Sequence, residues 1–178
     1  MDLGLSGRTA IVTGASRGIG LAVVRGLVAE GVRVTAGARK SSAELDELAR
    51  TGAARLVEVD LAESDTPARL AAAAGDRIDI LVNNVGSAPA RTGGFGGITD
   101  EDWQASLTLN LMAAVRTTRA VLPVMVAAGK GAIVNISSAN AFLPDPAVMD
   151  YSAAKAALAN FSKSLSKEVG PHGIGSTR

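Results

Sequence analysis

Short runs of β-branched and other apolar residues alternate with longer Ala- and Leu-rich stretches along the chain. The short runs lie at residues 8–13, 32–36, 55–59, 79–82 and 131–137. The stretches between them carry apolar residues at helical spacing, which is typical of the strand–helix units of a parallel sheet. Several runs are apolar on both sides of the pleat, as expected of strands covered on both faces. The pattern therefore predicts an α/β protein with an interior, doubly wound parallel sheet.

Two of the predicted helices are long. The segment 100–128 reads as one helix, with Thr99 as its N-cap and Pro123 as a possible kink, and a second helix spans about 150–169. The Gly-rich stretch 86–97 is long enough for a loop but too short to divide domains. We therefore expect one domain over residues 1–178.

Composition narrows the classes of function. The 178 residues are 47% hydrophobic, and 18 basic against 17 acidic side chains give a net charge of +1. A nucleic-acid or acidic-membrane binder would carry a stronger positive field, so neither partner is expected. The N-terminus lacks the basic and apolar regions of a signal peptide, and the apolar run from Leu109 is interrupted by Arg116, Arg119 and Pro123. We expect a cytoplasmic protein without a membrane span.

The chain offers few groups for metal or nucleophilic chemistry. It has no Cys, and His172 is its single His. Disulfides, thiolate nucleophiles, a zinc cluster and a Ser-His-Asp triad are therefore excluded, and no metal site is expected. Catalytic proton transfer must use other side chains.

A glycine-rich turn follows the first predicted strand. The stretch "IVTGASRGIG" places Gly14, Gly18 and Gly20 between that strand and a helix. Glycines permit a tight turn and let backbone N–H groups approach a pyrophosphate at the positive end of the helix. The spacing GxxxGxG is weak evidence by itself, and a plain strand-to-helix turn is the alternative.

The end of the second predicted strand bears on which dinucleotide would bind. An acid there suits the ribose 2′-hydroxyl of NAD, whereas an Arg suits the 2′-phosphate of NADP. The stretch "VTAGARK" has Arg39 and no acid, and Arg17 in the glycine turn could form the other half of a cationic clamp. NADP is favoured over NAD, unless Arg17, Arg39 and Lys40 are simply solvated loop charges.

Tyr151 and Lys155 stand four residues apart on the last predicted helix and share one face. An ammonium beside a phenol favours the phenolate, which could exchange a proton with a substrate oxygen. Ser138 ends the preceding predicted strand, on the side of a parallel sheet where ligands bind. Ser137 is the competing hydroxyl, and the alternative role for one of the two is a bond to backbone alone. An exposed helix pair is the alternative for Tyr151 and Lys155.

Taken together, these motifs resemble those of the short-chain dehydrogenase/reductase family, in particular its 3-oxoacyl carrier-protein reductases. The matching pieces, in the family's order and spacing, are "TGASRGIG", "VDL" at 59–61, "LVNNVG" at 81–86, Asn110 in "TLNLMAA", "IVNISS" and "YSAAK". The resemblance extends from about residue 3 to 174. It implies a Rossmann-type sheet with helices on both faces and hydride transfer between NADP(H) and a small carbonyl, alcohol or oxoacyl substrate.

The resemblance also implies roles for individual residues. Tyr151 would be the acid/base, Lys155 would adjust its ionisation and hold the nicotinamide ribose, Ser138 would bond the substrate oxygen, and Asn110 would anchor a relay water. The implied cofactor contacts are Gly14, Ser16, Arg17, Gly18, Ile19, Gly20, Arg39, Asp60, Leu61, Asn84, Val85, Gly86, Tyr151 and Lys155. Asp60 could instead cap the following turn, and Asn110 could be a buried amide bonded to backbone. Val85 departs from the family's usual Ala.

The C-terminal sequence departs from the family pattern as well. "GPHGI" is followed by Gly175, Ser176, Thr177 and Arg178 where the family continues into a sixth strand, a substrate lid and a seventh strand. Loss of one base from codons for Ile-Arg-Val-Asn would give Ile-Gly-Ser-Thr, so we hypothesise a frameshift. We expect the last strands to be missing, the run 131–137 to become an exposed sheet edge, and folding to be marginal. A non-catalytic dinucleotide-binding fragment is the alternative function, and a complete protein would form a homodimer or homotetramer.

Overall fold

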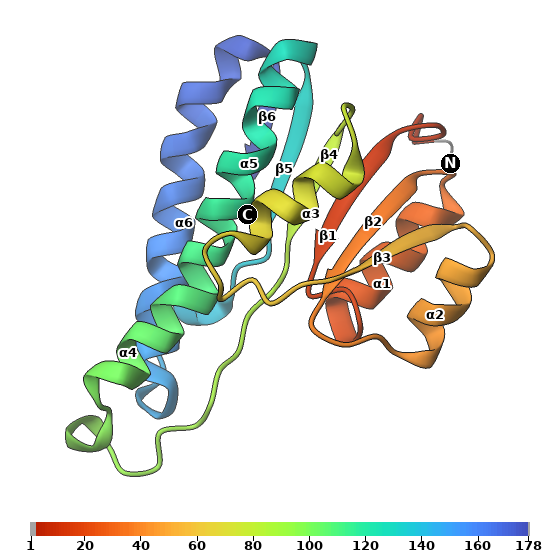
Figure 1. Ribbon diagram of the computed structural model, residues 1–178. Coiled ribbons are helices and arrows are strands. Elements are labelled where there is room, and N and C mark those ends of the chain that lie inside the picture. The colour runs from red at the N-terminus through yellow and green to blue at the C-terminus, as the bar shows by residue number, and fades with distance from the viewer. Residues whose placement is uncertain (1–2, 178) are drawn as a thin grey trace.

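The computed structural model describes residues 3–177, which form a parallel sheet flanked by helices (Figure 1). The strands are β1 (Thr9–Thr13), β2 (Arg33–Ala38), β3 (Ala54–Glu58), β4 (Ile80–Asn83), β5 (Gly131–Asn135) and β6 (Ile174–Thr177). Their order across the sheet is β3-β2-β1-β4-β5-β6, and every neighbouring pair is parallel. The order reverses between β1 and β4, so that a ligand crevice is expected at the carboxyl ends of these two strands.

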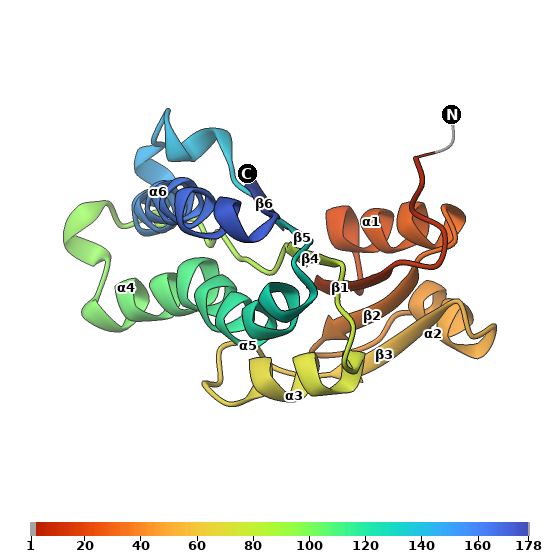
Figure 2. The same ribbon diagram turned by 90° about the horizontal axis from the view of Figure 1, so that it is seen from above.

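The helices lie in two layers, as the view from above shows (Figure 2). One face carries α1 (Gly18–Ala29) and α2 (Ala43–Arg50). The other carries α3 (Thr66–Ala74), α5 (Ala113–Ala128) and α6 (Met149–Val169), with α4 (Asp100–Leu107) continuing α5 toward the bottom of Figure 1. The doubly wound, Rossmann-type arrangement predicted from the sequence is confirmed.

Burial on both faces explains the apolar strands. All five residues of β1 are buried, and two apolar clusters pack on the two sides of the sheet. Ile11 and Ile133 belong to the cluster under α3, α5 and α6, whereas Val12 and Val34 belong to the cluster under α1 and α2. The strand boundaries differ from the sequence-based ones by at most two residues at either end.

The long helix over 100–128 is interrupted by a π-helical segment. Thr99 caps α4 through a reciprocal capping box, because its side chain accepts from the Asp102 N–H while the Asp102 carboxylate accepts from the Thr99 N–H. Residues Thr108–Met112 form the π-helical turn, which carries the buried Asn110. Pro123 lies inside α5, where the helix continues. The N-cap was predicted correctly, but the position of the irregularity was not.

The C-terminal sequence forms a strand, which corrects our expectation for this end of the sheet. Gly131 to Val134 of β5 pair with Ile174 to Thr177 of β6, so β5 is not the exposed edge. The αL residue Gly173 makes the turn possible, because a Cβ there would collide with the Gly129 carbonyl oxygen. The four residues Ile174 to Thr177 are therefore enough to add a sixth strand to the sheet. Arg178 lies outside the described residues.

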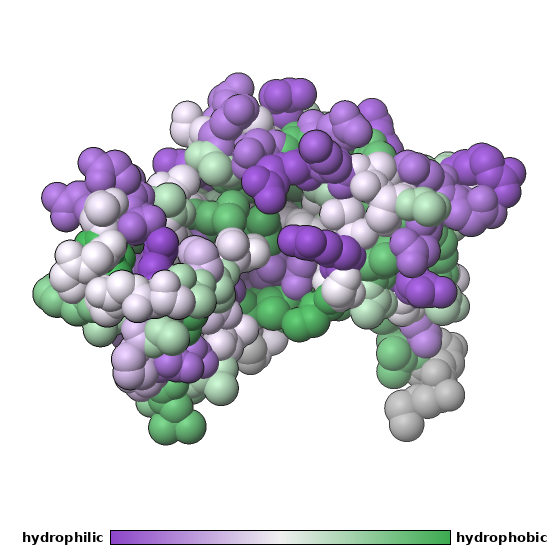
Figure 3. All heavy atoms as spheres, turned by 90° about the horizontal axis from the view of Figure 1, so that it is seen from below, coloured by the Kyte–Doolittle hydropathy of each residue, from purple (hydrophilic) through white to green (hydrophobic). Residues whose placement is uncertain are grey.

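One part of the sheet has little cover. β4, β5 and β6 are backed by α5 and α6 on one side, whereas on the side of α1 Ala132 is exposed and Val134 and Ile136 are half-buried. The view from below shows the surface hollowed between the part that carries α6 and the part that carries α1, with hydrophobic residues inside the hollow (Figure 3). This open apolar face adjoins the carboxyl ends of the strands.

Candidate active site

The first helix presents an uncapped N-terminus to the carboxyl edge of the sheet. Gly14 (φ 64°) and Gly18 (φ 55°) have left-handed conformations that other residues rarely adopt. Arg17, the N-cap of α1, makes no side-chain capping bond, and the first turn holds no acidic residue. The free N–H groups and the helix dipole together suit a phosphate.

A cleft of about 820 Å³ runs along this edge. Its lining residues come from the glycine turn, the end of β2, the segment after β3 and the segment after β4. They include 11 of the predicted cofactor contacts, namely Gly14, Ser16, Arg17, Gly18, Ile19, Arg39, Asp60, Leu61, Asn84, Val85 and Gly86. Gly20, Asn110, Ser138, Tyr151 and Lys155 are not among the lining residues. The structure therefore gathers most of the predicted cofactor contacts in one cavity.

Hydrogen bonds join the glycine turn to the segment after β4. The Thr13 hydroxyl oxygen accepts from the N–H groups of Asn84 (2.9 Å) and Val85 (3.1 Å). The Asn84 amide donates to the carbonyl oxygens of Thr13 and Gly14, each at 3.0 Å. A Cβ on Gly20 would strike the Gly14 carbonyl oxygen, so that glycine at position 20 lets α1 pack closely against the turn. Gly20 therefore does not line the cleft but allows the close packing that gives it its shape.

The cationic side chains of the cleft are Arg17, Arg39 and Lys40, and all three are exposed. Asp60 is the acidic residue in the lining. Its carboxylate accepts from the Ala62 N–H at 3.0 Å, as the turn-capping alternative required. Arg39 and Lys40 directly follow Ala38, the last residue of β2, where no acid is present.

Asn110 anchors the far end of the cleft. Its amide forms two bonds with the Ser87 backbone, accepting from the N–H and donating to the carbonyl, each at 2.9 Å, and it also donates to the Ser106 carbonyl. A Cβ on Gly86 would lie 2.8 Å from the Asn110 amide oxygen and 3.6 Å from the Lys155 ammonium nitrogen. Asn110, Gly86 and Lys155 thus meet at one point, and the buried-amide alternative for Asn110 is seen in the structure.

Tyr151 and Lys155 share one face of α6, as their spacing predicted. Lys155 Nζ lies 5.8 Å from the centre of the Tyr151 ring and donates to the Ile136 carbonyl at 2.7 Å. Lys155 is 3% exposed, and burial lowers the pKa of its ammonium from 10.5 to about 8. The amine is still mostly charged at neutral pH, and Tyr151 is half-buried beside it. The exposed-pair alternative is wrong.

The two adjacent serines differ. Ser138 caps the short turn Ala139–Ala141, accepting from the Asn140 N–H at 3.2 Å, which leaves its own hydroxyl hydrogen free to donate. The Asn140 amide donates to Ser152 on α6 at 3.5 Å and so ties this turn to the helix of Tyr151. The Ser137 hydroxyl is buried and has no bonding partner among the described residues.

Sequence reasoning missed part of the site. The cleft is also lined by Gly37, Ala38, Ser41, Ser42, Val59, Ser87 and Leu109. The Ser87 backbone bonds the Asn110 side chain, 23 residues away, and no local sequence pattern predicts such a pair. Gly37 and Ala38 could have been found, because they end the second predicted strand on the ligand side of the sheet.

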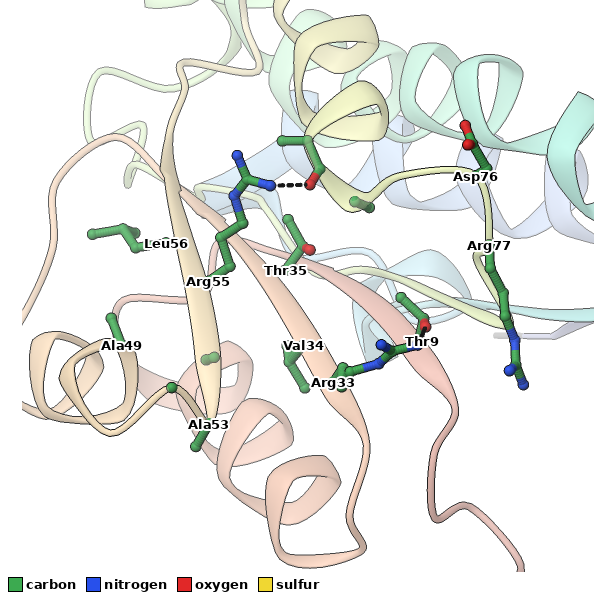
Figure 4. A pocket seen from close by; sticks show the side chains of 14 residues that line it. Thr9, Arg33, Val34, Thr35, Ala49, Ala53, Arg55, Leu56, Asp76 and Arg77 are labelled. Carbon is green, nitrogen blue, oxygen red and sulfur yellow. Dashed lines mark hydrogen bonds between the residues drawn. The ribbon is translucent and has the colours of Figure 1, made fainter.

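A second cavity, of about 780 Å³, opens toward the amino ends of β1, β2 and β3 (Figure 4). Its guanidinium groups are engaged with the protein. Arg55 donates to the Ala73 carbonyl near the end of α3, Arg33 donates to the Thr9 hydroxyl, and Arg77 pairs with Asp79. No pair comparable to Tyr151 and Lys155 is among its described lining residues, so the candidate active site is the one at the carboxyl edge.

One described helix, Asp100–Ala128, is long enough to span a membrane and contains an 18-residue stretch with a mean hydropathy of 1.4. A core helix passes the same test. Val121 and Met125 of this helix are fully buried in the cluster under the sheet, which accounts for part of its apolar character.

Comparison with known proteins agrees with the geometry. The chain is 36% identical over 178 residues to a 3-oxoacyl-[acyl-carrier-protein] reductase of Synechocystis, covering 96% of this chain and 71% of that protein. It is 34% identical to the uncharacterized oxidoreductase YvrD of Bacillus subtilis, covering 94% and 65%. The chain thus spans about two thirds of the length of these relatives.

A solved structure extends the likeness. L-sorbose reductase from Gluconobacter frateurii, complexed with NADPH and L-sorbose, superimposes with a TM-score of 0.90 at 37% identity, covering 98% of this chain and 68% of that one. The family model of the short chain dehydrogenases matches residues 8–177. With this match over nearly the whole chain, on a Rossmann-type sheet whose carboxyl edge carries the site, the chain belongs to the short chain dehydrogenase family.

Proposed function

We propose that the protein is an NADP-dependent oxidoreductase that interconverts a ketone or oxoacyl group and a secondary alcohol, with Tyr151 as the acid/base. One observation carries this proposal. The buried Lys155 amine lies beside the Tyr151 ring and next to Gly86, which lines the cleft of about 820 Å³. A proton-transfer pair adjoining such a cleft suits hydride transfer coupled to protonation.

The residues of the cleft fit the cofactor. The uncapped α1 terminus and the glycine turn, with Gly14, Ser16, Gly18, Ile19 and Gly20, would hold the pyrophosphate. Arg17 and Arg39 would hold the 2′-phosphate of NADP, because guanidinium groups match phosphate geometry and no acid follows β2. Asp60 and Leu61 would contact the adenine, and Asn84, Val85 and Gly86 would line the central part. The NADPH complex of L-sorbose reductase supports this choice of cofactor.

The chemistry divides between cofactor and protein. The nicotinamide, when bound, supplies the hydride that adds to the carbonyl carbon. The Tyr151 phenol gives its proton to the carbonyl oxygen, so that one C–H bond and one O–H bond form as the C=O π bond is lost. The Ser138 hydroxyl donates to the same oxygen and orients it. Lys155 stabilises the phenolate left on Tyr151, and Asn110 anchors a relay water through which the phenol regains its proton.

Steady-state kinetics with Tyr151→Phe test the proposal. The purified protein should oxidise NADPH in the presence of a ketone or oxoacyl thioester, and Tyr151→Phe should lower kcat by at least about a hundredfold because general acid catalysis contributes about that much. NADPH binding, followed by its fluorescence, should be unchanged in the variant. Equal turnover by the wild type and the variant would refute the role of Tyr151.

The alternative is a protein that binds the dinucleotide without turning over substrate. The observation favouring it is that Ser138, Tyr151 and Lys155 are not among the residues that line the cleft. Tight NADPH binding without oxidation by any of a broad set of ketones, aldehydes and oxoacyl thioesters would support this function instead.

The proposal also covers the domain organisation, the cellular location and the oligomeric state of the protein. We infer one nucleotide-binding domain over the chain, acting in the cytoplasm on small molecules. A homodimer or homotetramer would use the apolar residues that α5 leaves partly uncovered, among them Leu122 and Val126, which is 38% exposed. Light scattering on the purified protein measures the oligomeric state.

A further inference from the structure

Arg91, in the segment after β4, joins three parts of the chain. Its backbone N–H donates to the Ala147 carbonyl at 2.7 Å. Its guanidinium donates through Nε (3.2 Å) and Nη2 (2.6 Å) to one carboxylate oxygen of Asp150, and through Nη1 (2.7 Å) to Asp102. Asp102 belongs to the capping box of α4, and Asp150 lies in the first turn of α6. Arg91 therefore ties the loop that borders the cleft to the starts of both helices.

Asp150 directly precedes Tyr151 and is fully buried, whereas the Arg91 side chain is 15% exposed and that of Asp102 is 34% exposed. Burial raises the pKa of Asp150, but the Arg91 guanidinium and the Tyr151 N–H outweigh this effect, so the pKa is lowered. A buried carboxylate depends on its partner to stay ionised without a large cost.

The charge of Asp150 bears on the phenol. An anion one residue from Tyr151 opposes the phenolate, whereas the Lys155 ammonium favours it. The turn Ala139–Ala141, which packs against α6, carries no charge. Besides Asp102 and Asp150, the charged residues in the first turn of α4 and in the turn before α6 are Asp100, Glu101 and Asp145, and all three are exposed. Arg91 is the cation that bonds Asp150, so it cancels the opposing field.

We propose that Arg91 is a positioning residue for Tyr151: it fixes the first turn of α6 against the loop after β4 and neutralises the buried carboxylate of the neighbouring Asp150. This inference rests on the proposed role of Tyr151. It concerns a residue 60 positions away that no sequence motif marks.

Tyr151 is the single tyrosine of the chain, so the ultraviolet difference absorbance of tyrosinate reports on it alone. The titration needs neither cofactor nor substrate, and failure of this inference is thereby distinguishable from absence of turnover. We expect Arg91→Met to move the tyrosinate titration to higher pH, because the unpaired Asp150 carboxylate disfavours a second negative charge on the next residue. Arg91→Lys, which keeps the charge, should titrate close to the wild type.

Asp150→Asn is the complementary variant. It removes the opposing anion and leaves Arg91 charged, so half-ionisation should occur at lower pH than in the wild type. Adding Asp150→Asn to Arg91→Met should reverse the effect of the latter. If Arg91→Met fails to fold, which circular dichroism would reveal, Asp150→Asn and the double variant decide the question.

Arg50→Met is the matched control, because Arg50 also pairs with a carboxylate, Glu47, but on the exposed surface of α2. It should leave the titration of Tyr151 unchanged. Folded Arg91→Met and Asp150→Asn proteins that both titrate like the wild type, or an equal shift in Arg50→Met, would overturn the proposal.

Discussion

Lys155 is the residue at which the proposed function and stability of the fold oppose each other. Its ammonium is buried beneath Gly86 and Tyr151, and burial alone lowers its pKa from 10.5 to about 8. Such a change corresponds to about 3 kcal/mol of unfolding free energy lost while the amine is charged. Holding this charge next to the phenol is useful for proton transfer and costly for folding.

Lys155→Met should therefore reverse that balance. Because the folded protein binds the proton less tightly than the unfolded chain does, wild-type stability should rise between about pH 8 and pH 10.5 and stay level below pH 8. The variant lacks this rise, so at pH 7 it should be more stable by up to about 3 kcal/mol, less the lost bond to the Ile136 carbonyl. Urea unfolding of both proteins across this range measures the difference. Parallel pH profiles would contradict this explanation.

Arg39 makes the cofactor prediction specific. Arg39→Ala should weaken NADPH binding by about tenfold or more, since a charge-assisted bond to phosphate contributes about 1.5–3 kcal/mol, and should leave NADH binding unchanged. Arg25→Ala is the matched control, because it removes an exposed Arg on α1, away from the end of β2. Equal losses for NADPH and NADH would show that Arg39 does not read the 2′-phosphate. Isothermal titration with both cofactors gives the comparison.

At the scale of residues, the sequence predicted those that follow a local rule. Tyr151 and Lys155 are one helical turn apart, and Gly14 and Gly18 lie in a strand-to-helix turn, so their placement follows from spacing. Arg91 and Asp150 are 59 residues apart and meet only because the loop after β4 passes the start of α6. The position of such a pair depends on the tertiary structure, which a single sequence does not disclose.

Close packing constrains the elements that shape the site. Two glycines of α1 allow a direct test of this constraint. Gly20 and Gly26 both lie in this helix, but a Cβ on Gly20 would collide with the Gly14 carbonyl, whereas one on Gly26 would meet nothing within 4 Å. Gly26→Ala should stabilise the fold by about 0.5–1 kcal/mol through helix propensity. Gly20→Ala should destabilise it and weaken NADPH binding by displacing the phosphate turn. Thermal melting and NADPH titration of the two variants decide this, and similar behaviour would contradict it.

The capping box of α4 carries a second prediction for an element. Thr99→Ala removes the side-chain acceptor for the Asp102 N–H and should cost about 1 kcal/mol of unfolding free energy. Without this acceptor, the backbone N–H groups at the start of α4 should exchange faster with solvent. Arg91 would still bond the Asp102 carboxylate. An unchanged stability would mean that the Arg91 bond holds this turn without the cap.

Element boundaries were predictable where composition changes sharply, and the exceptions have physical causes. Thr99 was identified as an N-cap from its residue type and the helical pattern after it. The π-helical turn at Asn110 was not, because the interruption satisfies a tertiary contact with the Ser87 backbone. β6 was missed because Gly175, Ser176 and Thr177 have little strand character by themselves, while pairing with β5 favours it.

At the scale of the whole molecule, the uncovered side of β4, β5 and β6 is the most unusual surface. Apolar residues exposed in one patch favour association or dye binding. We expect the protein to bind an apolar fluorescent dye, and Val134→Thr, which places a hydroxyl on that face, to reduce the signal at equal folded fraction. Val121 is a fully buried residue of α5. Val121→Thr should therefore destabilise the protein without selectively reducing dye binding. Equal dye binding by the wild type and a folded Val134→Thr protein would contradict the exposed-patch interpretation.

The central claim is that the chain transfers a hydride from NADPH to a carbonyl carbon with Tyr151 supplying the proton. The most direct measurement uses NADPH carrying deuterium on the transferring carbon, with mass spectrometry of the alcohol formed from a set of ketones and oxoacyl thioesters. We predict one deuterium on the carbinol carbon with the wild-type protein and at least about a hundredfold less product with Tyr151→Phe. Bound NADPH without deuterated alcohol from any substrate would contradict the claim and leave a dinucleotide-binding protein without turnover.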